Sequence, residues 1–291
     1  MLHDCVMKLN KWSRRPEGTK PVREVFTMWK YTRMVVLVAL TAAMYAAVLI
    51  PFKLLPIIPG ITEVRPANVF PVICSLMFGP AGAWGAAFGN LIGDLMGGTY
   101  GLGSYVGMLG NFWFGYIPYR MWRLLSKNEP VPWGFSKLLR YLPITLLASL
   151  ACGVQIGWGL DTLGLVPFHV LAPLITVNNF ITAAILGPLL LPVLYPRVKR
   201  WGLLYHDIME PEDLSTGTIP HVGHLLLWVA LLGSLYFGIS MSLGVTDAAS
   251  INLGFGLEIT IPIELLVSMG DNVTVGILPF LVLLVVSCLM I

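Results

Sequence analysis

The stretch GAWGAAFGNLIGDLMGG, residues 82–98, combines two features that seldom share one helix. Its glycines recur every fourth residue, at Gly85, Gly89, Gly93 and Gly97, and would form one nearly bare helix face. Asn90 and Asp94, also four residues apart, lie one position round from that stripe. Small residues at this spacing let membrane helices pack closely, and a carboxylate in a membrane is expensive and usually functional. The stripe therefore predicts a packing face, and the polar pair predicts contact with a solute.

The composition identifies the surroundings of this helix as a membrane. Hydrophobic residues make up 56% of the 291 residues and charged residues only 11%. Apolar runs long enough to cross about 30 Å of hydrocarbon recur along the chain. The short alternating segments that are typical of a β-barrel do not dominate. The sequence therefore predicts an all-α, polytopic helical membrane protein.

Eight membrane helices are predicted between breaks that are rich in proline and glycine. The breaks include PIIPG at 56–60, GP at 79–80, GGTYGLG at 97–103 and YP at 195–196. The helices are expected at residues 33–50, 67–79, 81–97, 103–125, 137–160, 168–195, 221–244 and 273–291. Residues 33–200 would form a six-helix solute-binding core, and residues 221–291 would add two transmembrane helices.

Basic residues are distributed unevenly between the two sides. Sixteen of the 18 lysines and arginines fall in the N-terminal tail and in the connections after the fourth and sixth helices. Lys53 and Arg65, the other two, fall in the alternate connections. Because cytoplasmic loops are enriched in lysine and arginine, both termini are predicted to be cytoplasmic in a multi-pass protein of the inner or plasma membrane.

The segments outside the spans are short. Residues 1–32 are interpreted as a solvated, basic cytoplasmic tail, and residues 201–220, with HDIMEPEDL at 206–214, as a solvated acidic cytoplasmic loop. Residues 245–272 contain the apolar stretch LEITIPIELL at 257–266, which is too short for a span and is split by Pro262. We expect this connection to be an external flap or an interfacial segment.

The sequence carries no catalytic or metal-binding motif, so neither an enzyme activity nor a cofactor is predicted. There is no HExxH, GxSxG or Walker sequence. His221 and His224 are interpreted as interface positions. The cysteines, at Cys5, Cys74, Cys152 and Cys288, form no CxxC pair and are interpreted as small apolar residues.

Polar and aromatic residues gather near the predicted external ends of the helices. Intramembrane ionisable groups usually face a bundle interior or a watery cavity, and Asp94 lies level with segments 63–68 and 97–104. Each amide could instead form an interhelical hydrogen bond that only holds the bundle together, and Glu63 with Arg65 could be a surface salt bridge. The candidate solute-binding residues are Glu63, Arg65, Asn68, Asn90, Asp94, Tyr100, Asn111, Trp113, Tyr116, Gln155, Asn178 and Asn179.

Several stretches together resemble a known family over residues 30–200. A basic N-terminus leads into ALTAA at 39–43, and FPVICSLMFGPAGAWGAAFGNLIGDLMGG follows at 70–98. Then come GNFWFGYIPYRMWR at 110–123 and NNFITAAILGPLLLPVLYPRV at 178–198. The chain resembles the substrate-binding S components of energy-coupling factor (ECF) transporters, including the branch associated with queuosine precursors. The most specific part is the apolar run ending in GP, followed by a glycine-rich helix ending in GD.

The resemblance implies high-affinity capture and uptake of a small water-soluble vitamin or precursor. It implies three kinds of partner besides the lipid bilayer: the small-molecule solute, a transmembrane coupling subunit and cytoplasmic ATPase subunits. A row of small residues on the first helix contacts the coupling subunit in that family, and this row corresponds to Ala39, Ala43 and Ala47. No nucleic acid partner is expected.

Other functions stay open because the last two helices have no counterpart in the six-helix pattern. These helices could cap the pocket, occupy the place of a partner, or mark a different transporter that shares the core. One alternative is an ion-coupled secondary transporter acting alone, with Asp94 as a protonatable coupling site. Another is a membrane enzyme or an assembly scaffold.

Overall fold

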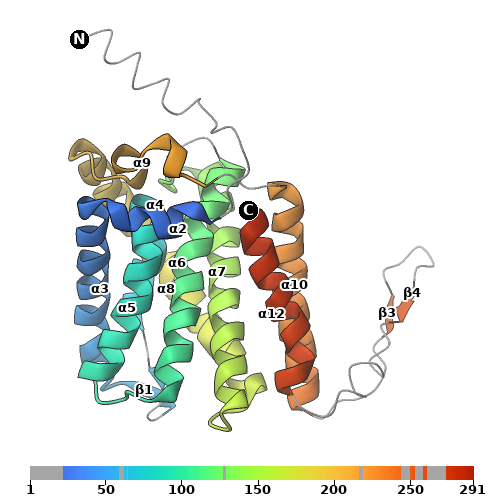
Figure 1. The fold of residues 1–291 in the computed structure, drawn as a ribbon. Helices are drawn as coiled ribbons and strands as arrows, with labels where there is room; N and C mark the ends of the chain where they lie inside the picture. The colour runs from blue at the N-terminus through green and yellow to red at the C-terminus, as the bar shows by residue number, and fades with distance from the viewer. Residues whose placement is uncertain are drawn as a thin grey trace.

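The computed structural model describes residues 22–58, 62–63, 65–126, 129–215, 219–243, 250–252, 258–260 and 273–291. The predicted all-α fold class is confirmed, because the eight expected helices are all present as a bundle (Figure 1). They are α3 (Thr32–Phe52), α4 (Val69–Phe78), α5 (Pro80–Met96), α6 (Leu102–Leu125), α7 (Phe135–Thr162), α8 (Phe168–Arg200), α10 (Pro220–Ser242) and α12 (Val273–Met290).

Short elements lie at the two ends of the bundle, which we call the α2 end and the β1 end (Figure 1). The α2 end carries α2 (Arg23–Thr27), η1 (Met28–Lys30), α9 (Tyr205–Ile208) and η3 (Pro211–Asp213). The β1 end carries an antiparallel pair, β1 (Pro56–Ile58) and β2 (Thr62–Glu63), followed by η2 (Pro66–Asn68). Between α10 and α12, β3 (Ser250–Asn252) pairs antiparallel with β4 (Glu258–Thr260). The rest of the predicted flap, residues 245–272, lies outside the described residues.

Five helical stretches are long and apolar enough to cross a membrane, judged by length and composition. They comprise α3, α7, α8 with its continuation, α10 and α12. Helix α4 is too short to cross, since its 10 residues span only about 15 Å. It is instead enclosed by α5, α6 and α8, and all of its residues except Phe70 are buried. The shortest predicted helix therefore forms the centre of the bundle.

The GP break at residues 79–80 is confirmed, and the YP break at 195–196 is wrong. Gly79 has φ +55°, a conformation that glycine adopts without strain, and this residue turns the chain between α4 and α5. At the second break, α8 continues through Pro196 to Arg200. Proline is tolerated inside membrane helices because neighbouring groups satisfy the freed backbone carbonyls, so this dipeptide does not end the helix.

The glycine stripe of α5 is a packing face, as the sequence predicted, and the neighbour that it contacts is α3. A Cβ atom added to Gly89 would lie 2.8 Å from Tyr45 Cδ1 and 3.0 Å from Ala42 O. A Cβ added to Gly93 would lie 2.5 Å from Leu49 Cδ2. These separations are too short for real Cβ contacts, so the two backbones approach this closely only because α5 has glycine there.

Helix α3 has two alanine rows that face in different directions. Ala42 and Ala46 are buried against the neighbouring helices. Ala39, Ala43 and Ala47, the row implied by the family resemblance to contact a coupling subunit, are exposed. The buried row belongs to the packing of this chain, whereas the exposed row is left on its surface.

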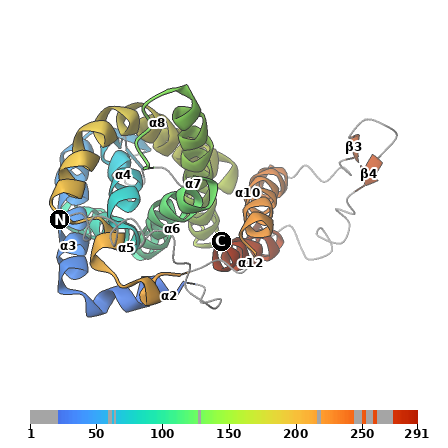
Figure 2. The same ribbon diagram turned by 90° about the horizontal axis from the view of Figure 1, so that it is seen from above.

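Helices α10 and α12 pack against each other and against α7 and α8, on the side of the bundle away from α3 (Figure 2). Trp158 Nε1 of α7 donates to Thr274 O of α12 at 3.0 Å. His169 Nδ1 of α8 lies 2.8 Å from Ser242 Oγ of α10. The two additional helices therefore leave the exposed alanine row of α3 uncovered.

Candidate functional site

Buried polar side chains gather inside the bundle toward its β1 end. They come from α3, α5, α6, α8 and the two connections that join α3 to α4 and α5 to α6. The five most enclosed members, one tyrosine and four asparagines, are no more than 2% exposed. We call this group the polar cluster; its members are Tyr45, Lys53, Arg65, Asn68, Asn90, Asp94, Thr99, Asn111 and Asn179.

One branch of the polar cluster is charged. Lys53 Nζ donates to Asp94 Oδ1 at 2.8 Å and to Thr99 Oγ1 at 2.6 Å. The Lys53 and Asp94 side chains are 6% and 11% exposed, so this ion pair is largely withdrawn from water. Asn90 Nδ2 donates to Asp94 Oδ2 at 3.3 Å, and Arg65 Nη1 donates to Asn90 Oδ1 at 3.2 Å. The carboxylate is therefore held by a cation, a hydroxyl and an amide.

The other branch consists of amides around Tyr45. The Tyr45 hydroxyl lies 2.8 Å from Asn68 Oδ1 and 2.9 Å from Asn111 Oδ1. Asn68 Nδ2 donates to Asn179 Oδ1, and Asn111 Nδ2 donates to Gly107 O at 2.9 Å. Because one O–H group supplies one proton, it serves a single amide oxygen at a time. The other oxygen can accept a hydrogen bond from a bound molecule.

The two branches meet on α6 beside Gly107. A Cβ atom added to Gly107 would lie 2.8 Å from Asn90 Nδ2. The close approach of α6 to α5 therefore brings Asn90 of the charged branch beside the helical turn that carries Asn111 of the amide branch. A buried set with both carboxylate and amide groups can bind a small polar molecule by hydrogen bonds from several sides.

The structure brings six of the twelve sequence-predicted residues into the polar cluster. These are Arg65, Asn68, Asn90, Asp94, Asn111 and Asn179. Sequence reasoning missed Tyr45, Lys53 and Thr99. A signal existed for Lys53, because it is one of only two basic residues in the alternate connections. No comparable pattern distinguished Tyr45 from the other aromatic residues or Thr99 from the rest of its loop.

Three of the remaining predicted residues are more exposed than the buried amides of the polar cluster. Tyr100 is 49% exposed, and its ring packs edge-on against Tyr105. Gln155 on α7 and Asn178 on α8 are half-buried, and Glu63 lies in β2, opposite Pro56.

Two predicted aromatic residues of α6 face a different part of the bundle. Trp113 is half-buried and packs edge-on against Tyr116 at 5.8 Å between ring centroids. The Tyr116 hydroxyl donates to Cys288 O of α12 at 3.0 Å, and the Arg120 guanidinium lies 5.9 Å from the Tyr116 ring centroid. Tyr116 therefore binds α12, and its ring lies near a cation of the α2 end.

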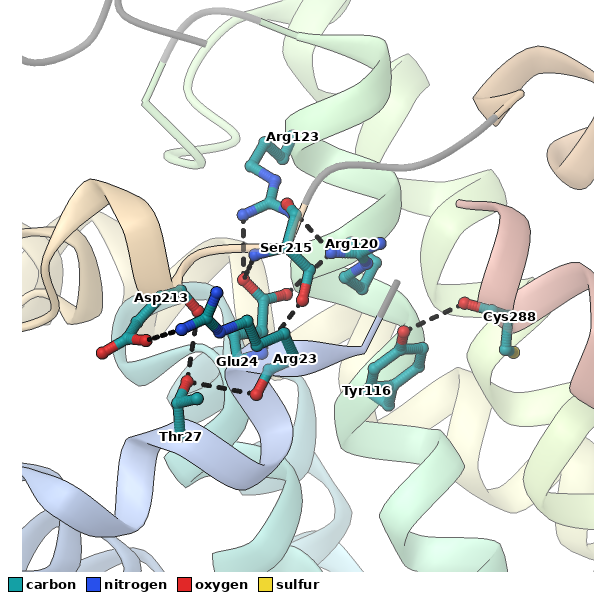
Figure 3. A network of polar contacts seen from close by, with 9 residues as sticks. All are labelled: Arg23, Glu24, Thr27, Tyr116, Arg120, Arg123, Asp213, Ser215 and Cys288. Atoms are coloured by element: carbon teal, nitrogen blue, oxygen red, sulfur yellow. Dashed lines mark hydrogen bonds and ion pairs between the residues drawn. The ribbon is translucent and has the colours of Figure 1, made fainter. Parts of the chain in front are cut away.

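A second buried polar group lies at the α2 end (Figure 3). Glu24 Oε1 lies 2.8 Å from Arg120 Nη1, and both side chains are fully buried. Glu24 Oε2 lies 3.1 Å from Arg123 Nη1 and accepts a hydrogen bond from Ser215 N at 2.9 Å. Ser215 Oγ in turn accepts from Glu24 N at 2.9 Å. We call Glu24, Arg120, Arg123 and Ser215 the Glu24 cluster; it ties α2 and the segment before α10 to α6.

The Glu24 cluster corrects the interpretation of residues 22–32 as solvated tail. Val25 and Met28, like Glu24, are buried in the described part of this segment. Burial alone would raise the pKa of the Glu24 carboxyl, but Arg123, Arg120 and the Ser215 N–H outweigh burial and lower that pKa. Charge counting along the sequence missed this carboxylate because its nearest charged neighbours in the sequence are basic.

The acidic loop is also less solvated than predicted. Asp213 is 7% exposed; its Oδ1 lies 3.2 Å from Arg23 Nη2, and its Oδ2 accepts from the Tyr31 hydroxyl at 2.7 Å. Arg23 and Lys30 of the N-terminal segment therefore neutralise Asp213 of the α8–α10 connection. Within the described residues, no group of three or more His, Cys, Asp or Glu side chains could hold a metal ion.

Comparison with known proteins gives one match. A family model described as QueT transporter matches residues 35–196. This range includes most of α3, all of α4 to α7, most of α8 and every member of the polar cluster, and it excludes α10 and α12. No curated protein and no solved structure matches the chain.

Proposed function

Because the chain belongs to the QueT transporter family, we propose that it captures a small water-soluble vitamin or nucleobase-like precursor as the substrate-specific subunit of an ECF-type transporter. The family assignment itself makes the chain a membrane transport protein for a small solute. It also agrees with the resemblance of residues 30–200 to S components and their queuosine-precursor branch. The proposal adds the binding site, the partners and the direction of transport.

The polar cluster is the observation that carries this proposal. It lies within the matched range, and it is enclosed by helices that otherwise present apolar side chains. Buried polar groups in a membrane bundle are expensive unless they are paired, and they commonly mark a substrate pathway. A carboxylate at Asp94 and amides at Asn68, Asn111 and Asn179 suit a compact solute with several hydrogen-bonding edges.

The direction of transport follows from the positions of the charged residues. We propose that the β1 end faces the outside and the α2 end the cytoplasm, because cytoplasmic segments are enriched in Lys and Arg. Lys53 and Arg65 are the exceptions, and both lie in the polar cluster. The site would then receive its solute from outside the cell, and both termini would be cytoplasmic.

The exposed alanine row of α3 is the proposed docking face for a transmembrane coupling subunit. Ala39, Ala43 and Ala47 lie on the surface away from α10 and α12, so the additional helices leave this row free. Small residues at four-residue spacing allow a partner helix to approach closely. We expect Ala43→Trp to abolish co-purification of the coupling subunit and its ATPases while solute binding is kept. Ile185→Trp, on the exposed face of α8, is the matched control.

Identification of the co-purified solute tests the proposed function directly. The full chain is purified from its membrane, and the bound small molecules are identified by mass spectrometry. We expect a heterocyclic vitamin or precursor that binds without ATP and is taken up by cells only when ATPase subunits are present. Uptake into proteoliposomes by this chain alone, driven by a pH gradient and lost in Asp94→Asn, would instead establish the ion-coupled alternative.

A further inference from the structure

Lys53 is not explained by the proposed function as it stands. It is a cation within the polar cluster, which is expected to bind solute, and it already holds the Asp94 carboxylate. Resting on the proposed function, we propose that Lys53 is an internal stand-in for the solute. Its ammonium group binds the Asp94 carboxylate until a solute with two parallel N–H donors displaces it.

The Lys53 side chain packs against the end of the glycine stripe. Lys53 is the C-cap of α3, and its aliphatic stem crosses α5 at Gly97, the last member of the glycine stripe. A Cβ atom added to Gly97 would collide with the Lys53 stem and would lie 2.7 Å from its Cε atom. The stripe therefore ends in a groove that contains the lysine stem, and this groove lets the ammonium group reach Asp94 and Thr99.

The acceptor capacity of Asp94 makes the lysine a competitor. A carboxylate offers about four acceptor positions, and Lys53, Thr99 and Asn90 use three of them. A solute edge with two parallel N–H donors needs two positions side by side, as an arginine does when it binds a carboxylate. One of the present donors must therefore leave before such an edge can bind.

Lys53 is the donor best able to leave. Asn90 is fixed on the same helix as Asp94, one turn away. Lys53 has a long flexible stem, and the next residue, Leu54, is 84% exposed in the turn after α3. A rotation of the stem out of the Gly97 groove brings the ammonium group into water, where it needs no protein partner.

Lys53 affects solutes differently according to the number of N–H donors that they present. A solute without N–H donors that pushed Lys53 aside would leave the Asp94 charge buried and unpaired, which is strongly unfavourable. A solute with two donors replaces the bonds that are lost. Lys53 therefore lowers the affinity most for a solute that must displace it, whereas a solute with one N–H donor can use the fourth acceptor position of Asp94 and leave Lys53 in place.

The test uses guanine and hypoxanthine as probes. Guanine presents a ring N–H beside an amino N–H, whereas hypoxanthine lacks the amino group. Binding to the purified full chain is measured by calorimetry for the wild type, Lys53→Met and Lys53→Arg. Lys30→Met, which replaces an exposed lysine at the α2 end, is the control.

We expect Lys53→Met to bind guanine about tenfold more tightly, because the competing state is removed. Hypoxanthine affinity should change far less, and Lys53→Arg should bind guanine more weakly than the wild type.

A second variant keeps the test decisive if Lys53→Met does not fold. Thr99→Val removes one of the two groups that hold the ammonium, and it should strengthen guanine binding by about two- to threefold. Guanine binding that is weakened or unchanged in the variant that folds would overturn the proposal, and so would an absence of guanine binding in all variants.

The failure of this inference can be told apart from failure of the proposed function. Another heterocycle that co-purifies and binds equally to the wild type and Lys53→Met would leave the transport function standing and remove the role of Lys53. If no heterocycle co-purifies or binds to any variant, the proposed function itself fails.

Discussion

At the scale of single residues, Asn178 and Asn179 show how a helix separates two adjacent polar side chains. Both were candidates from the sequence, and they are adjacent in α8, so their side chains point in different directions. Asn179 is 2% exposed and accepts a hydrogen bond from Asn68, whereas Asn178 is half-buried. The helical geometry therefore separates two residues that the sequence treats alike.

We expect Asn179→Ala to weaken solute binding by tenfold or more, because it removes a cluster amide and leaves Asn68 Nδ2 without its acceptor. A buried polar group without its partner costs about 1–3 kcal/mol. Asn178→Ala should change the affinity by less than about twofold, since its half-buried side chain points in a different direction from that of Asn179. Calorimetry with the co-purified solute measures both. Equal losses of affinity in the two variants would contradict the placement of the site.

Glu24 provides a residue-scale prediction about pH. Its pKa is lowered in the folded protein, so its ionised form stabilises the fold above the pKa of an unfolded glutamate. That contribution is lost as the pH falls through the lowered value. We expect thermal stability in detergent to hold between about pH 5 and 8 and to fall below about pH 4, the range of an ordinary glutamate.

The matched variant Glu24→Gln isolates this carboxylate. Because it leaves Arg120 buried without its counter-ion, we expect a loss of about 3–5 kcal/mol of unfolding free energy at pH 7. The difference from the wild type should shrink as the pH falls below 4, because protonated Glu24 resembles glutamine. A difference that is constant over the whole pH range would contradict the buried ion pair.

At the scale of elements, the glycine stripe of α5 performs two tasks. Along most of its length it lets α3 pack closely, with Gly85 and Gly89 facing Thr41 and Tyr45. At Gly97 it admits the stem of Lys53, whose ammonium group reaches Asp94. The sequence could predict the packing role, because four-residue spacing is visible in one helix. It could not predict the second role, because Lys53 is 41 residues from Asp94 along the chain.

Gly89→Ala tests the packing role. The added methyl group would meet the Tyr45 ring at 2.8 Å and the backbone oxygen of Ala42 at 3.0 Å, so α3 and α5 must separate. We expect a loss of stability of about 1–3 kcal/mol, which is the usual effect of overpacking. Gly103→Ala on α6 is the control, because its methyl group would meet Leu160 Cδ1 at 3.6 Å, an ordinary contact. Thermal unfolding in detergent compares the two, and an equal effect would contradict close α3–α5 packing.

At the scale of the whole molecule, composition, long apolar runs and breaks rich in proline and glycine were enough to predict the class and the eight helices. The position of α4 at the centre was not predictable, because an apolar stretch of 10 residues has the same composition whether lipid or protein surrounds it. The packing of residues 22–31 was also missed. Their burial depends on Ser215 and Asp213, which lie more than 180 residues away along the chain.

The orientation of the whole molecule is the prediction on which the direction of transport rests. Leu54, at the β1 end, is 84% exposed, and Trp133, in the connection before α7 at the opposite end, is 75% exposed. We expect Leu54→Cys to react with a membrane-impermeant maleimide in intact cells and Trp133→Cys to react only after the membrane is opened. Cys5→Ser provides the background, because Cys74, Cys152 and Cys288 are buried. Labelling of Trp133→Cys alone in intact cells would show that the protein has the opposite orientation in the membrane. The polar cluster would then lie nearer the cytoplasm.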